Sequence, residues 1–435
     1  MGASIKYKDS GAEWIGEIPS TWSIGRIGQL YIERKQKVSD KDYPPLSVTM
    51  SGIMPQLDTA AKSDAHDDRK LVLKGDFAIN SRSDRRGSCG ISAYDGSVSL
   101  INTVLKPKGN FSPDYYGWLF KSTMFSDEYY KWGHGIVDDL WTTNWQDMKK
   151  IVIPIPSLLE QEKIASFLNK KCNEIDNIIR NTENSIEDYR KLKQSIITEA
   201  VTKGISGKHH QMSDSGINWI GEIPASWSMM RMKNCVKQRI SGSWGEDAQK
   251  NENDVVCMRI ADFDYDRLLF NKSGKYTIRN YDRSIISKLQ LTDGDILIEK
   301  SGGGDKTPVG RAVVFDLGIT ALYANFMDKI VCKPEYNSRW FAYVFAAFYQ
   351  NGFTKNYIKQ TTGIQNLDLS AMLATEKIPI PPLSEQEQIV EELDCKCSEI
   401  NDFIDKKKQF ISELLLYKQS IIYEYVTGKK EVPEL

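Results

Sequence analysis

The sequence is poor in the residues and motifs that most enzymes use for catalysis. Its 435 residues include only four histidines, which are His66, His134, His209 and His210. It has no G-x-S-x-G nucleophile elbow, no H-E-x-x-H zinc helix and no G-x-G-x-x-G cofactor loop. The stretch SGGGDKT at 301–307 lacks both glycines of a phosphate-binding P-loop, and Glu299 adjoins Lys300 without the intervening residue of nuclease sites. We therefore predict no catalytic residue and no metal site.

The sequence also has few cysteines, no long apolar run and a small net charge. Of the seven cysteines only Cys395 and Cys397 lie close together, and no histidine is near them, so we expect reduced structural thiols. No apolar run approaches the roughly 20 residues of a membrane span, and the first residues lack the apolar core of a secretory signal. We therefore expect a cytoplasmic protein without a membrane partner. The net charge of −1 gives no basic excess, although local basic patches can still attract nucleic acid.

What the sequence does contain is a tandem repeat. SGAEWIGEIPSTW at 10–22 returns as SGINWIGEIPASW at 215–227. IPIPSLLEQEKI from Ile153 returns as IPIPPLSEQEQI from Ile378, and KQSIITEAVT from Lys193 returns as KQSIIYEYVT from Lys418. Each half is therefore a short phrase, a long variable region, a proline hinge and a constant segment.

The constant segments predict two long helices. Residues 158–203 and 383–427 contain no Gly and no Pro, and their apolar residues recur at three- and four-residue spacing. A helix of this length is about 70 Å long, and its apolar stripe must be covered, most simply by the other copy in a coiled coil. Ser157 with Glu160 predicts a capping box, and Ser384 predicts the N-cap of the second helix. We assign these residues to the coiled coil and to partner docking: Ile164, Leu168, Ile175, Ile179, Ile186, Leu192, Ile389, Leu393, Ile400, Ile404, Ile411 and Leu414.

The variable regions predict compact mixed α/β domains. Short runs such as DFAIN at 76–80 and DILIEK at 295–300 follow Gly-Asp turns and are typical of strands, whereas 113–125 and 338–353 predict helices with aromatic core residues. We expect a mixed α/β fold, in which a tandem pseudo-twofold repeat of two globular domains is separated by two long antiparallel helices that form a coiled coil. The expected segments are domains at 1–156 and 206–381 and helical spacers at 157–205 and 382–435.

Two matched basic loops are the best candidates for a binding site. The loop NSRSDRRGSCG at 80–90 and the loop EKSGGGDKTPVGR at 299–311 both follow a Gly-Asp turn and a strand. Arginine can bind guanine through two hydrogen bonds, Asn and Gln can bind adenine, and Ser, Thr and Lys can bind phosphate. Any one such loop is equally well explained as a solvated turn. The candidates are Arg82, Ser83, Arg85, Arg86, Ser88, Asn144, Arg239, Lys300, Ser301, Lys306, Thr307, Arg311, Gln365 and Asn366.

The order of these motifs resembles the specificity subunit of type I restriction–modification systems over essentially the whole chain. Trp-Ile-Gly-Glu-Ile-Pro opens each half, and Ile-Pro-Ile-Pro-Pro-Leu-x-Glu-Gln precedes each long helix, with Ser157 in the first copy where the second has Pro382. The resemblance implies two target-recognition domains that read the halves of a bipartite, asymmetric site in double-stranded DNA. It also implies helices that dock two methyltransferase subunits, with endonuclease/translocase subunits completing the complex. This chain would hold no cofactor, and S-adenosylmethionine, ATP and Mg²⁺ would belong to the partners.

Two other classes of function remain open at this stage. One is a structural coiled-coil scaffold, and the other is a fused nuclease or methyltransferase with its own activity. A variant of the main interpretation is a phage-defence system that modifies DNA differently. The repeated phrase itself cannot read two different half-sites, so we expect its Trp14 and Trp22, and likewise Trp219 and Trp227, to pack where each domain meets the helices.

Overall fold

The computed structural model describes residues 6–56, 67–82, 85–135, 141–205, 211–272, 274–361 and 363–433. The chain forms two compact units. Unit 1 comprises Met1–Thr182 and Gln409–Leu435, and unit 2 comprises Glu183–Lys408. The division falls inside both long helices, so each unit combines one variable region with half of each helix. Among the described residues, no helix is both long and apolar enough to cross a membrane.

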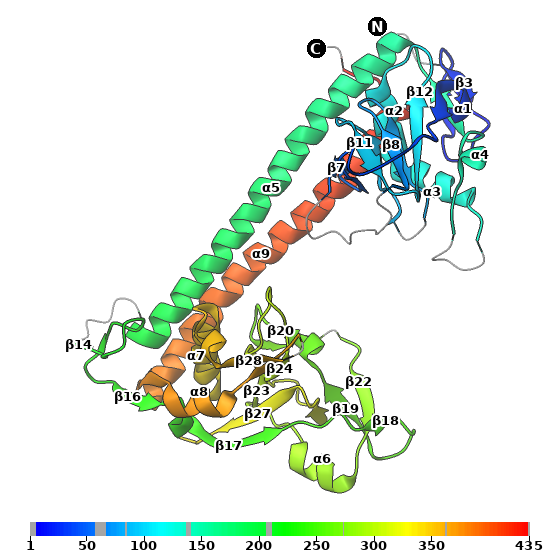
Figure 1. The fold of residues 1–435 in the computed structure, drawn as a ribbon. Helices are drawn as coiled ribbons and strands as arrows, with labels where there is room; N and C mark the ends of the chain where they lie inside the picture. Colours follow the sequence, from blue (N-terminus) through cyan, green and yellow to red (C-terminus); the bar gives the residue numbers. More distant parts are fainter. Residues whose placement is uncertain are drawn as a thin grey trace. The chain divides into compact units, whose positions relative to one another are not determined.

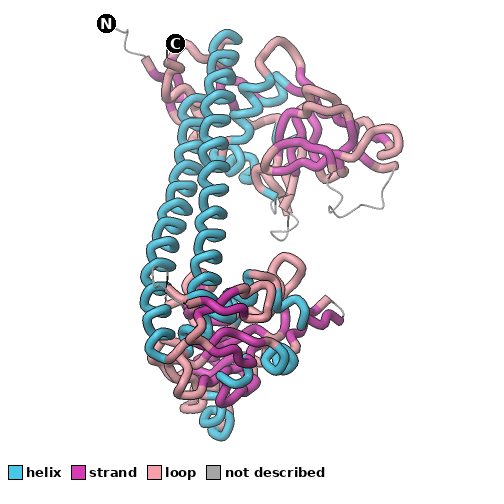
Figure 2. The backbone as a smooth tube through the Cα atoms, turned by 90° about the vertical axis from the view of Figure 1, so that its left-hand side faces the viewer, coloured by secondary structure: helices cyan, strands magenta, loops and turns pink. Residues whose placement is uncertain are grey.

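The two long helices are α5 (Leu158–Lys203, 46 residues) and α9 (Leu383–Val426, 44 residues). Within each unit their halves lie side by side and run antiparallel (Figures 1 and 2). In unit 1 the ring centroids of Phe167 and Tyr425 are 4.5 Å apart. In unit 2 Tyr189 stacks on Phe403 at 5.8 Å. This pairing and the mixed α/β units confirm the predicted fold class.

The apolar stripe of the helices has one misplaced member. Eleven of the twelve residues assigned to it are buried or half-buried. Leu192 is the exception, because its side chain is 49% exposed while the neighbouring Lys193 is 5% exposed. Lys193 fits there because its ammonium group donates to Asn401 Oδ1 at 2.8 Å and to the carbonyl of Asp266 at 3.0 Å. A purely apolar pattern cannot locate a lysine that is buried together with its acceptors.

Unit 1 is built on a four-stranded sheet of order β10-β9-β12-β4. Phe77 and Ile79 of β9 point to the face covered by α2, α3 and the long helices, whereas Ala78 points to a smaller core beneath a second sheet. This alternation follows from the two-residue period of a strand. The elements are β1 (Tyr7–Asp9), β2 (Glu17–Pro19), β3 (Ser23–Arg26), α1 (Ile27–Leu30), β4 (Tyr31–Glu33), β5 (Lys37–Val38), β6 (Leu46–Thr49), β7 (Gly52–Pro55), β8 (Arg69–Val72), β9 (Phe77–Asn80), β10 (Cys89–Ile91), β11 (Gly96–Val98), β12 (Asn102–Pro107), α2 (Pro113–Lys121), α3 (Thr123–Lys131), α4 (Trp145–Met148) and β13 (Val152–Ile155).

Unit 2 repeats this plan with the sheet β17-β27-β23-β25. Ile296 and Ile298 of β23 face the aromatic helix α7, whereas Leu297 faces the core of a second four-stranded sheet. The elements are β14 (Met212–Asp214), β15 (Glu222–Pro224), β16 (Ser228–Arg231), β17 (Val236–Ser241), β18 (Glu246–Asp247), β19 (Asp254–Met258), β20 (Phe263–Asp264), β21 (Leu269–Phe270), β22 (Thr277–Asn280), α6 (Arg283–Leu289), β23 (Ile296–Glu299), β24 (Ser301–Gly302), β25 (Ala312–Val314), β26 (Ala321–Tyr323), β27 (Met327–Cys332), α7 (Ser338–Gln350), β28 (Ile358–Thr361), β29 (Ile364–Leu367), α8 (Leu369–Thr375) and β30 (Lys377–Ile380), with 3₁₀ turns at Met232–Cys235, Ile260–Asp262 and Phe353–Tyr357.

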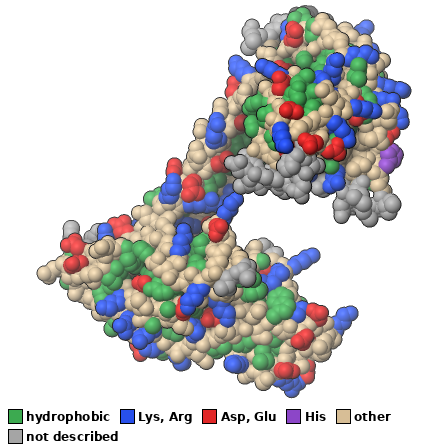
Figure 3. Space-filling model, in the orientation of Figure 1, with side chains coloured by type: hydrophobic (Ala, Val, Ile, Leu, Met, Phe, Trp, Pro, Cys, Tyr) green, Lys and Arg blue, Asp and Glu red, His purple; other side chains and the backbone are tan. Residues whose placement is uncertain are grey.

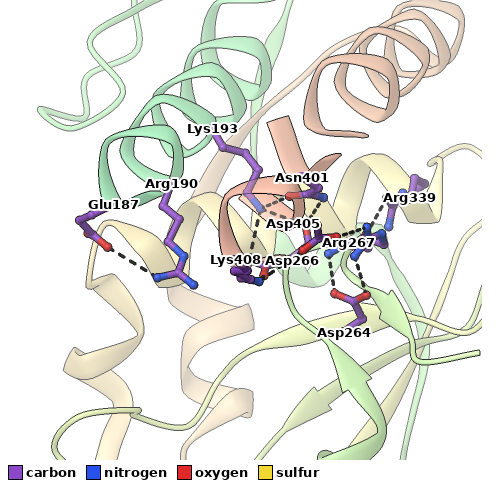
Figure 4. A network of polar contacts seen from close by, with 10 residues as sticks. All are labelled: Glu187, Arg190, Lys193, Asp264, Asp266, Arg267, Arg339, Asn401, Asp405 and Lys408. Carbon is purple, nitrogen blue, oxygen red and sulfur yellow. Dashed lines mark hydrogen bonds and ion pairs between the residues drawn. The ribbon is translucent and has the colours of Figure 1, made fainter. Parts of the chain in front are cut away.

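A hairpin links the variable region of unit 2 to the helix pair of that unit. The turn between β20 and β21 carries Asp266 and Arg267 onto α5 and α9 (Figure 4). Arg267 pairs with Asp405 at 2.9 Å, and Lys408 lies 3.5 Å from Asp266. These contacts are polar and partly solvated, so they orient the hairpin more than they stabilise it.

The repeated phrase packs as predicted, at the ends of the long helices. In unit 1 Trp14, Ile18 and Trp22 are buried in one core with Ile422 and Val426 at the end of α9. In unit 2 Ile223 and Trp227, the counterparts of Ile18 and Trp22, are buried with Ile197 and Val201 at the end of α5, and Trp219, the counterpart of Trp14, is partly buried against the same core. Each variable region is therefore anchored to the end of one helix, and the unit 1 core is completed by the C-terminal segment of the chain.

The repeated Glu-Gln pair explains how the phrase is held. Trp22 donates its indole N–H to Glu160 at 3.1 Å, and Trp227 donates to Glu385 at 2.9 Å. The next residue, Gln386, donates to the carbonyl of Pro381 at 2.9 Å and accepts from the backbone N–H of Asn337 at 2.8 Å. These bonds tie the proline hinge, the first helical turn and the N-cap of α7 together.

The unit 1 copy has the same arrangement around Gln161. Its side chain donates to the carbonyl of Pro156 at 2.9 Å and accepts from the backbone N–H of Ser112, the N-cap of α2, at 2.8 Å. The Glu-Gln motif is thus a structural joint in both halves.

Most of the predicted local structure is present. The strands predicted at 76–80 and 295–300 are β9 and β23, and the Ser157–Glu160 capping box is formed with N···O distances of 3.0 and 3.3 Å. Two details were wrong. The helix predicted over 113–125 breaks at Ser122, whose hydroxyl caps α3, and Ser384 is not an N-cap because α9 already begins at Leu383.

Candidate nucleic-acid interface

A buried aspartate organises the polar surface of unit 2. Asp328 lies on β27, and its Oδ1 accepts from the Lys300 ammonium and the Ser241 hydroxyl, both at 2.8 Å. Arg239 on β17 lies 3.5 Å from the other oxygen. We call Asp328, Lys300, Arg239 and Ser241 the Asp328 cluster. It carries two cations for one carboxylate, so a net positive charge remains at a partly exposed surface.

Hydrogen-bonding side chains adjoin this cluster along the same edge. Ser301 on β24 donates its hydroxyl to Asn366 Oδ1 at 2.7 Å, on the paired strand β29. Arg239 also donates to the Ser370 hydroxyl at 2.7 Å. The structure therefore brings together four predicted residues, Arg239, Lys300, Ser301 and Asn366, from positions up to 127 apart in the sequence.

The glycine-rich loop after β24 presents two further candidates to solvent. Lys306 and Thr307 are exposed at a tight turn closed by paired backbone bonds between Gly304 and Thr307 at 3.1 Å. Gly303 has φ +64°, and a Cβ there would lie 2.9 Å from the carbonyl of Thr307. Only glycine permits this close return of the chain. Lys306 is thus an exposed cation in a turn of fixed geometry.

Two side chains of unit 2 that were predicted to bind DNA are instead bonded to other groups of the protein. Arg311 forms a two-point pair with Glu299, at 3.0 and 2.7 Å, and lies 3.7 Å over the Tyr265 ring. Burial lowers the pKa of the Arg311 guanidinium, but the bonds and charge of Glu299 outweigh it and the pKa is raised. Gln365 is buried and accepts from the Val309 N–H at 3.3 Å. Both side chains hold the loop in place, and their positions do not favour DNA contact.

The first basic loop is held against a neighbouring segment. Asn80 accepts from the backbone N–H of Arg82 at 3.0 Å, Tyr130 donates to the Arg82 carbonyl at 2.8 Å, and Arg82 bridges to Thr142. Arg82, Arg85 and Arg86 are all exposed. Arg86 lies 3.6 Å from Asp127, and its guanidinium is 5.1 Å from the Tyr130 ring. Unit 1 therefore presents three arginines on a braced loop.

The other predicted residues of unit 1 are Ser83, Ser88 and Asn144. Ser83 lies outside the described residues. Ser88 is buried, because its backbone pairs with Asn80 where β10 begins. Asn144 caps α4 by accepting from the N–H groups of Gln146 and Asp147 at 2.8 and 3.2 Å, and this role explains its side chain without a ligand.

Sequence reasoning missed several members of the polar surface. Ser241 stands two residues after Arg239 on one strand, so the two-residue period could have placed both on one face. Asp328 had no such signal, because it lies on β27 beside Lys329 and its partners Lys300 and Arg239 come from distant parts of the sequence.

A cavity in unit 2 is lined by charged side chains that pair with one another. A cavity of about 560 Å³ in unit 2 is lined by Asp266, Arg267, Arg339 and Asp394, among others. Arg339 pairs with Asp394 at 2.8 Å and donates to the Arg267 carbonyl at 2.9 Å, so these charges satisfy one another. Among the described residues, no group of three or more His, Cys, Asp or Glu side chains could hold a metal ion. On the face shown in Figure 3, blue and red side chains are interspersed over both units.

Residues 19–188 and 246–413 match the family model described as the type I restriction modification DNA specificity domain. These two segments cover more than half of the chain and fall in its two repeats. The chain therefore belongs to this family.

Curated relatives and a solved structure agree with this family. The type I restriction enzyme MjaVIII specificity subunit of Methanocaldococcus jannaschii is 26% identical over 96% of this chain and 95% of that protein. The putative MjaX specificity subunit of the same organism is 22% identical over 96% of both chains. A chain from a structure of a type I R-M system has a TM-score of 0.68 at 16% identity, covering 95% of this chain and 99% of that one. That structure supports the fold alone.

Proposed function

We propose that the chain is the sequence-specific DNA-binding subunit of a type I restriction–modification complex and that each unit reads one half of a bipartite, asymmetric DNA target. The proposal rests on the contrast between the structural elements that the two units share and the polar loops in which they differ. The helix ends, the Trp–Glu bonds and the Gln joints are the same in both units, whereas the polar loops after β9 and β23 differ. Two units with the same scaffold but different polar loops suit a DNA target whose two halves differ in sequence.

The exposed chemistry of each unit fits double-stranded DNA. Arg82, Arg85 and Arg86 in unit 1 can bind guanine edges or phosphates, and Lys300 and Lys306 in unit 2 can bind phosphates. Asn366 and Ser301 supply an amide and a hydroxyl for base edges on the same surface. The cations position the duplex, and the polar side chains discriminate among bases.

Partner subunits would dock on the outward faces of the long helices. The apolar residues first assigned to docking are largely buried against the rest of the chain, so they are not available to another protein. In unit 1 the exposed large apolar residues of α9 are Phe410, Leu415, Leu416 and Tyr417. We expect methyltransferase subunits to cover such positions. Methyl transfer, cleavage and the binding of S-adenosylmethionine, ATP and Mg²⁺ would belong to the partner subunits, and this chain would be non-catalytic.

The test replaces the arginines of the first loop. Arg82→Ala, Arg85→Ala and Arg86→Ala are combined, because all three side chains are exposed and little stability depends on them. The variant is co-expressed with its methyltransferase, and the methylated sites are mapped across the host genome. We expect assembly to persist while methylation is lost or relaxed at one half of the bipartite site. Each lost base contact should reduce binding roughly 5- to 150-fold.

A matched variant separates base reading from charge. The triple arginine-to-lysine variant keeps the positive charge but loses two-point contact to guanine. We expect it to bind DNA with relaxed specificity, whereas the alanine variant binds weakly. Loss of assembly in the alanine variant would favour a scaffold. Methyl transfer or cleavage by the purified chain alone would favour an enzyme.

A further inference from the structure

An apolar hollow of about 430 Å³ opens on the surface of unit 2. Its walls include Ile260, Ala261 and Ala324, and its rim carries two aromatic side chains, Trp244 and Phe326. Trp244 is 40% exposed and Phe326 is 49% exposed. Exposed aromatic residues around an apolar hollow are unusual on a monomer surface and mark binding sites.

The two aromatic residues lie on two loop segments that hydrogen bonds hold in close contact. The N–H groups of Gly242 and Ser243 donate to the carbonyls of Met327 and Tyr323 at 3.1 and 3.0 Å. A Cβ at Gly242 would lie 2.3 Å from the carbonyl of Ala324, so only glycine allows the segment to approach. Backbone contacts therefore determine the position of the two segments that border the hollow.

One of the residues that line the same hollow is an arginine with an unpartnered donor. Arg259 lines it, and its Nη2 lies 3.5 Å from Asp262. Its Nε is buried and has no hydrogen-bond partner among the described residues. A buried donor without an acceptor costs free energy, which an incoming acceptor would recover. Arg279 covers Trp244 at 4.7 Å from its ring and donates to its carbonyl at 3.2 Å, which fixes the indole.

The hollow shares an edge with the Asp328 cluster. The backbone N–H groups of Lys300 and Ser301 donate to the carbonyl of Phe326 at 2.9 and 3.3 Å. Ser241 of the cluster is three residues before Trp244 on the same segment. A DNA strand held by the cations of the cluster would therefore run beside the aromatic rim.

We propose that the Trp244–Phe326 hollow takes one unstacked nucleobase of the bound DNA. This inference rests on the proposed function, because the cluster must first hold the duplex. The aromatic rim stacks on the faces of the base, the apolar walls exclude water, and the partly exposed guanidinium of Arg259 donates to an acceptor on its edge. Unit 2 would then recognise, besides the base edges of a paired duplex, a base displaced from it.

A nucleobase fits better than an apolar protein segment. Such a segment would leave the Arg259 donor unsatisfied and would bring apolar surface against Lys300 and Arg239, whereas a nucleotide offers an acceptor and a phosphate together. A thymine methyl group inside a paired duplex is the other occupant that the test must separate, since it needs no unstacking.

The experiment compares two fluorescent duplexes of the target sequence found by methylation mapping. One is fully paired, and the other carries a single unpaired base. The unpaired base is placed in turn at each position of the half-site whose methylation changes in variants of unit 2. The full chain, in complex with its methyltransferase, is used as wild type, Trp244→Ala, Trp244→Phe and Phe326→Ala. Ile319→Ala, which removes an exposed apolar side chain elsewhere in unit 2, is the matched control.

We expect wild type to bind one unpaired-base duplex more tightly than the paired duplex. Trp244→Ala and Phe326→Ala should each remove that preference and weaken binding of this duplex roughly 5- to 150-fold, with Trp244→Phe close to wild type and Ile319→Ala unchanged. Equal weakening on both duplexes would overturn the proposal in favour of contact with a paired base. Unchanged binding in both alanine variants would also overturn it. If wild type fails to bind even the paired target, the proposed function itself is wrong.

Discussion

The ammonium group of Lys418 on α9 hydrogen-bonds both carboxylate oxygens of Asp176 on α5, at 2.6 and 2.7 Å. Its repeat counterpart, Lys193 on α5, donates to Asn401 on α9 at 2.8 Å. The same lysine of the repeated KQSII motif thus joins the helix pair in each unit. The surroundings differ, because Lys193 is buried whereas Asp176 is half exposed.

This difference predicts unequal costs of removing the two lysines. Lys193→Met should lower the local free energy of opening in unit 2 by about 2–4 kcal/mol, because it leaves Asn401 and the Asp266 carbonyl without their buried donor. Lys418→Met should cost at most about 1 kcal/mol, since its partner remains hydrated. Hydrogen exchange of the α5 and α9 amides, followed by mass spectrometry, measures both. Equal losses would show that burial does not govern this contact.

The glutamine joint predicts a second stability difference. Gln386→Ala removes the partners of the Pro381 carbonyl and the Asn337 N–H, and should destabilise unit 2 by about 2 kcal/mol. Glu391→Ala, an exposed change one turn further along α9, is the control and should have little effect. Thermal unfolding of the two variants gives the comparison, and similar midpoints would argue against the joint.

Arg311 and Lys306 belong to one basic loop but should behave in opposite ways. Arg311→Ala leaves Glu299 buried without its cation, so we expect a loss of about 2–4 kcal/mol in the stability of unit 2. Lys306→Ala removes an exposed cation and should leave stability unchanged while reducing the salt dependence of DNA binding by about one phosphate contact. Unfolding curves and binding at several salt concentrations test the pair. A stable Arg311→Ala variant with weakened DNA binding would restore Arg311 as a contact.

How far the sequence predicted the molecule depends on the range of the interaction. The capping box of Ser157, the long helices and β23 follow from patterns within a few residues, and all were found. The burial of Lys193 depends on acceptors on other elements, which no periodicity reveals.

The candidate interface shows the same limit. The Gly-Asp turns located the matched loops in the sequence. Whether each side chain is exposed or paired depends on partners that lie on other elements. Arg311 found Glu299 across the sheet, and Arg239 and Lys300 converged on Asp328. Opposite charges were visible in the sequence, whereas the strand pairing that joins them was not.

The burial of the cysteines predicts which thiols a reagent can modify in the folded chain. Only Cys395 is exposed among the seven free thiols. Burial raises the pKa of Cys89 to about 12 and that of Cys397 to about 11, so these thiols remain protonated and shielded. We expect iodoacetamide at pH 8 to modify the folded chain once, at Cys395, and to leave a Cys395→Ser variant unmodified. Peptide mapping identifies the site, and a second modified cysteine in the folded chain would contradict the burial.

The continuity of α5 and α9 predicts that they determine the spacing of the DNA target. The division between the units falls between Thr182 and Glu183 on α5 and between Lys408 and Gln409 on α9. Four residues inserted at both places add about one helical turn to each helix and keep the apolar stripes in phase. If these helices set the distance between the reading loops, the methylated target should keep both half-sites and gain a longer unspecified spacer.

The matched control inserts four residues into α5 alone. This shifts the α5 stripe by one turn along α9 and should separate Lys418 from Asp176 or Lys193 from Asn401, so assembly should weaken. Methylation mapping of both variants gives the spacer directly. An unchanged spacer in the double insertion, with assembly intact, would show that the helices do not act as a ruler and that the spacing is set by the partner subunits.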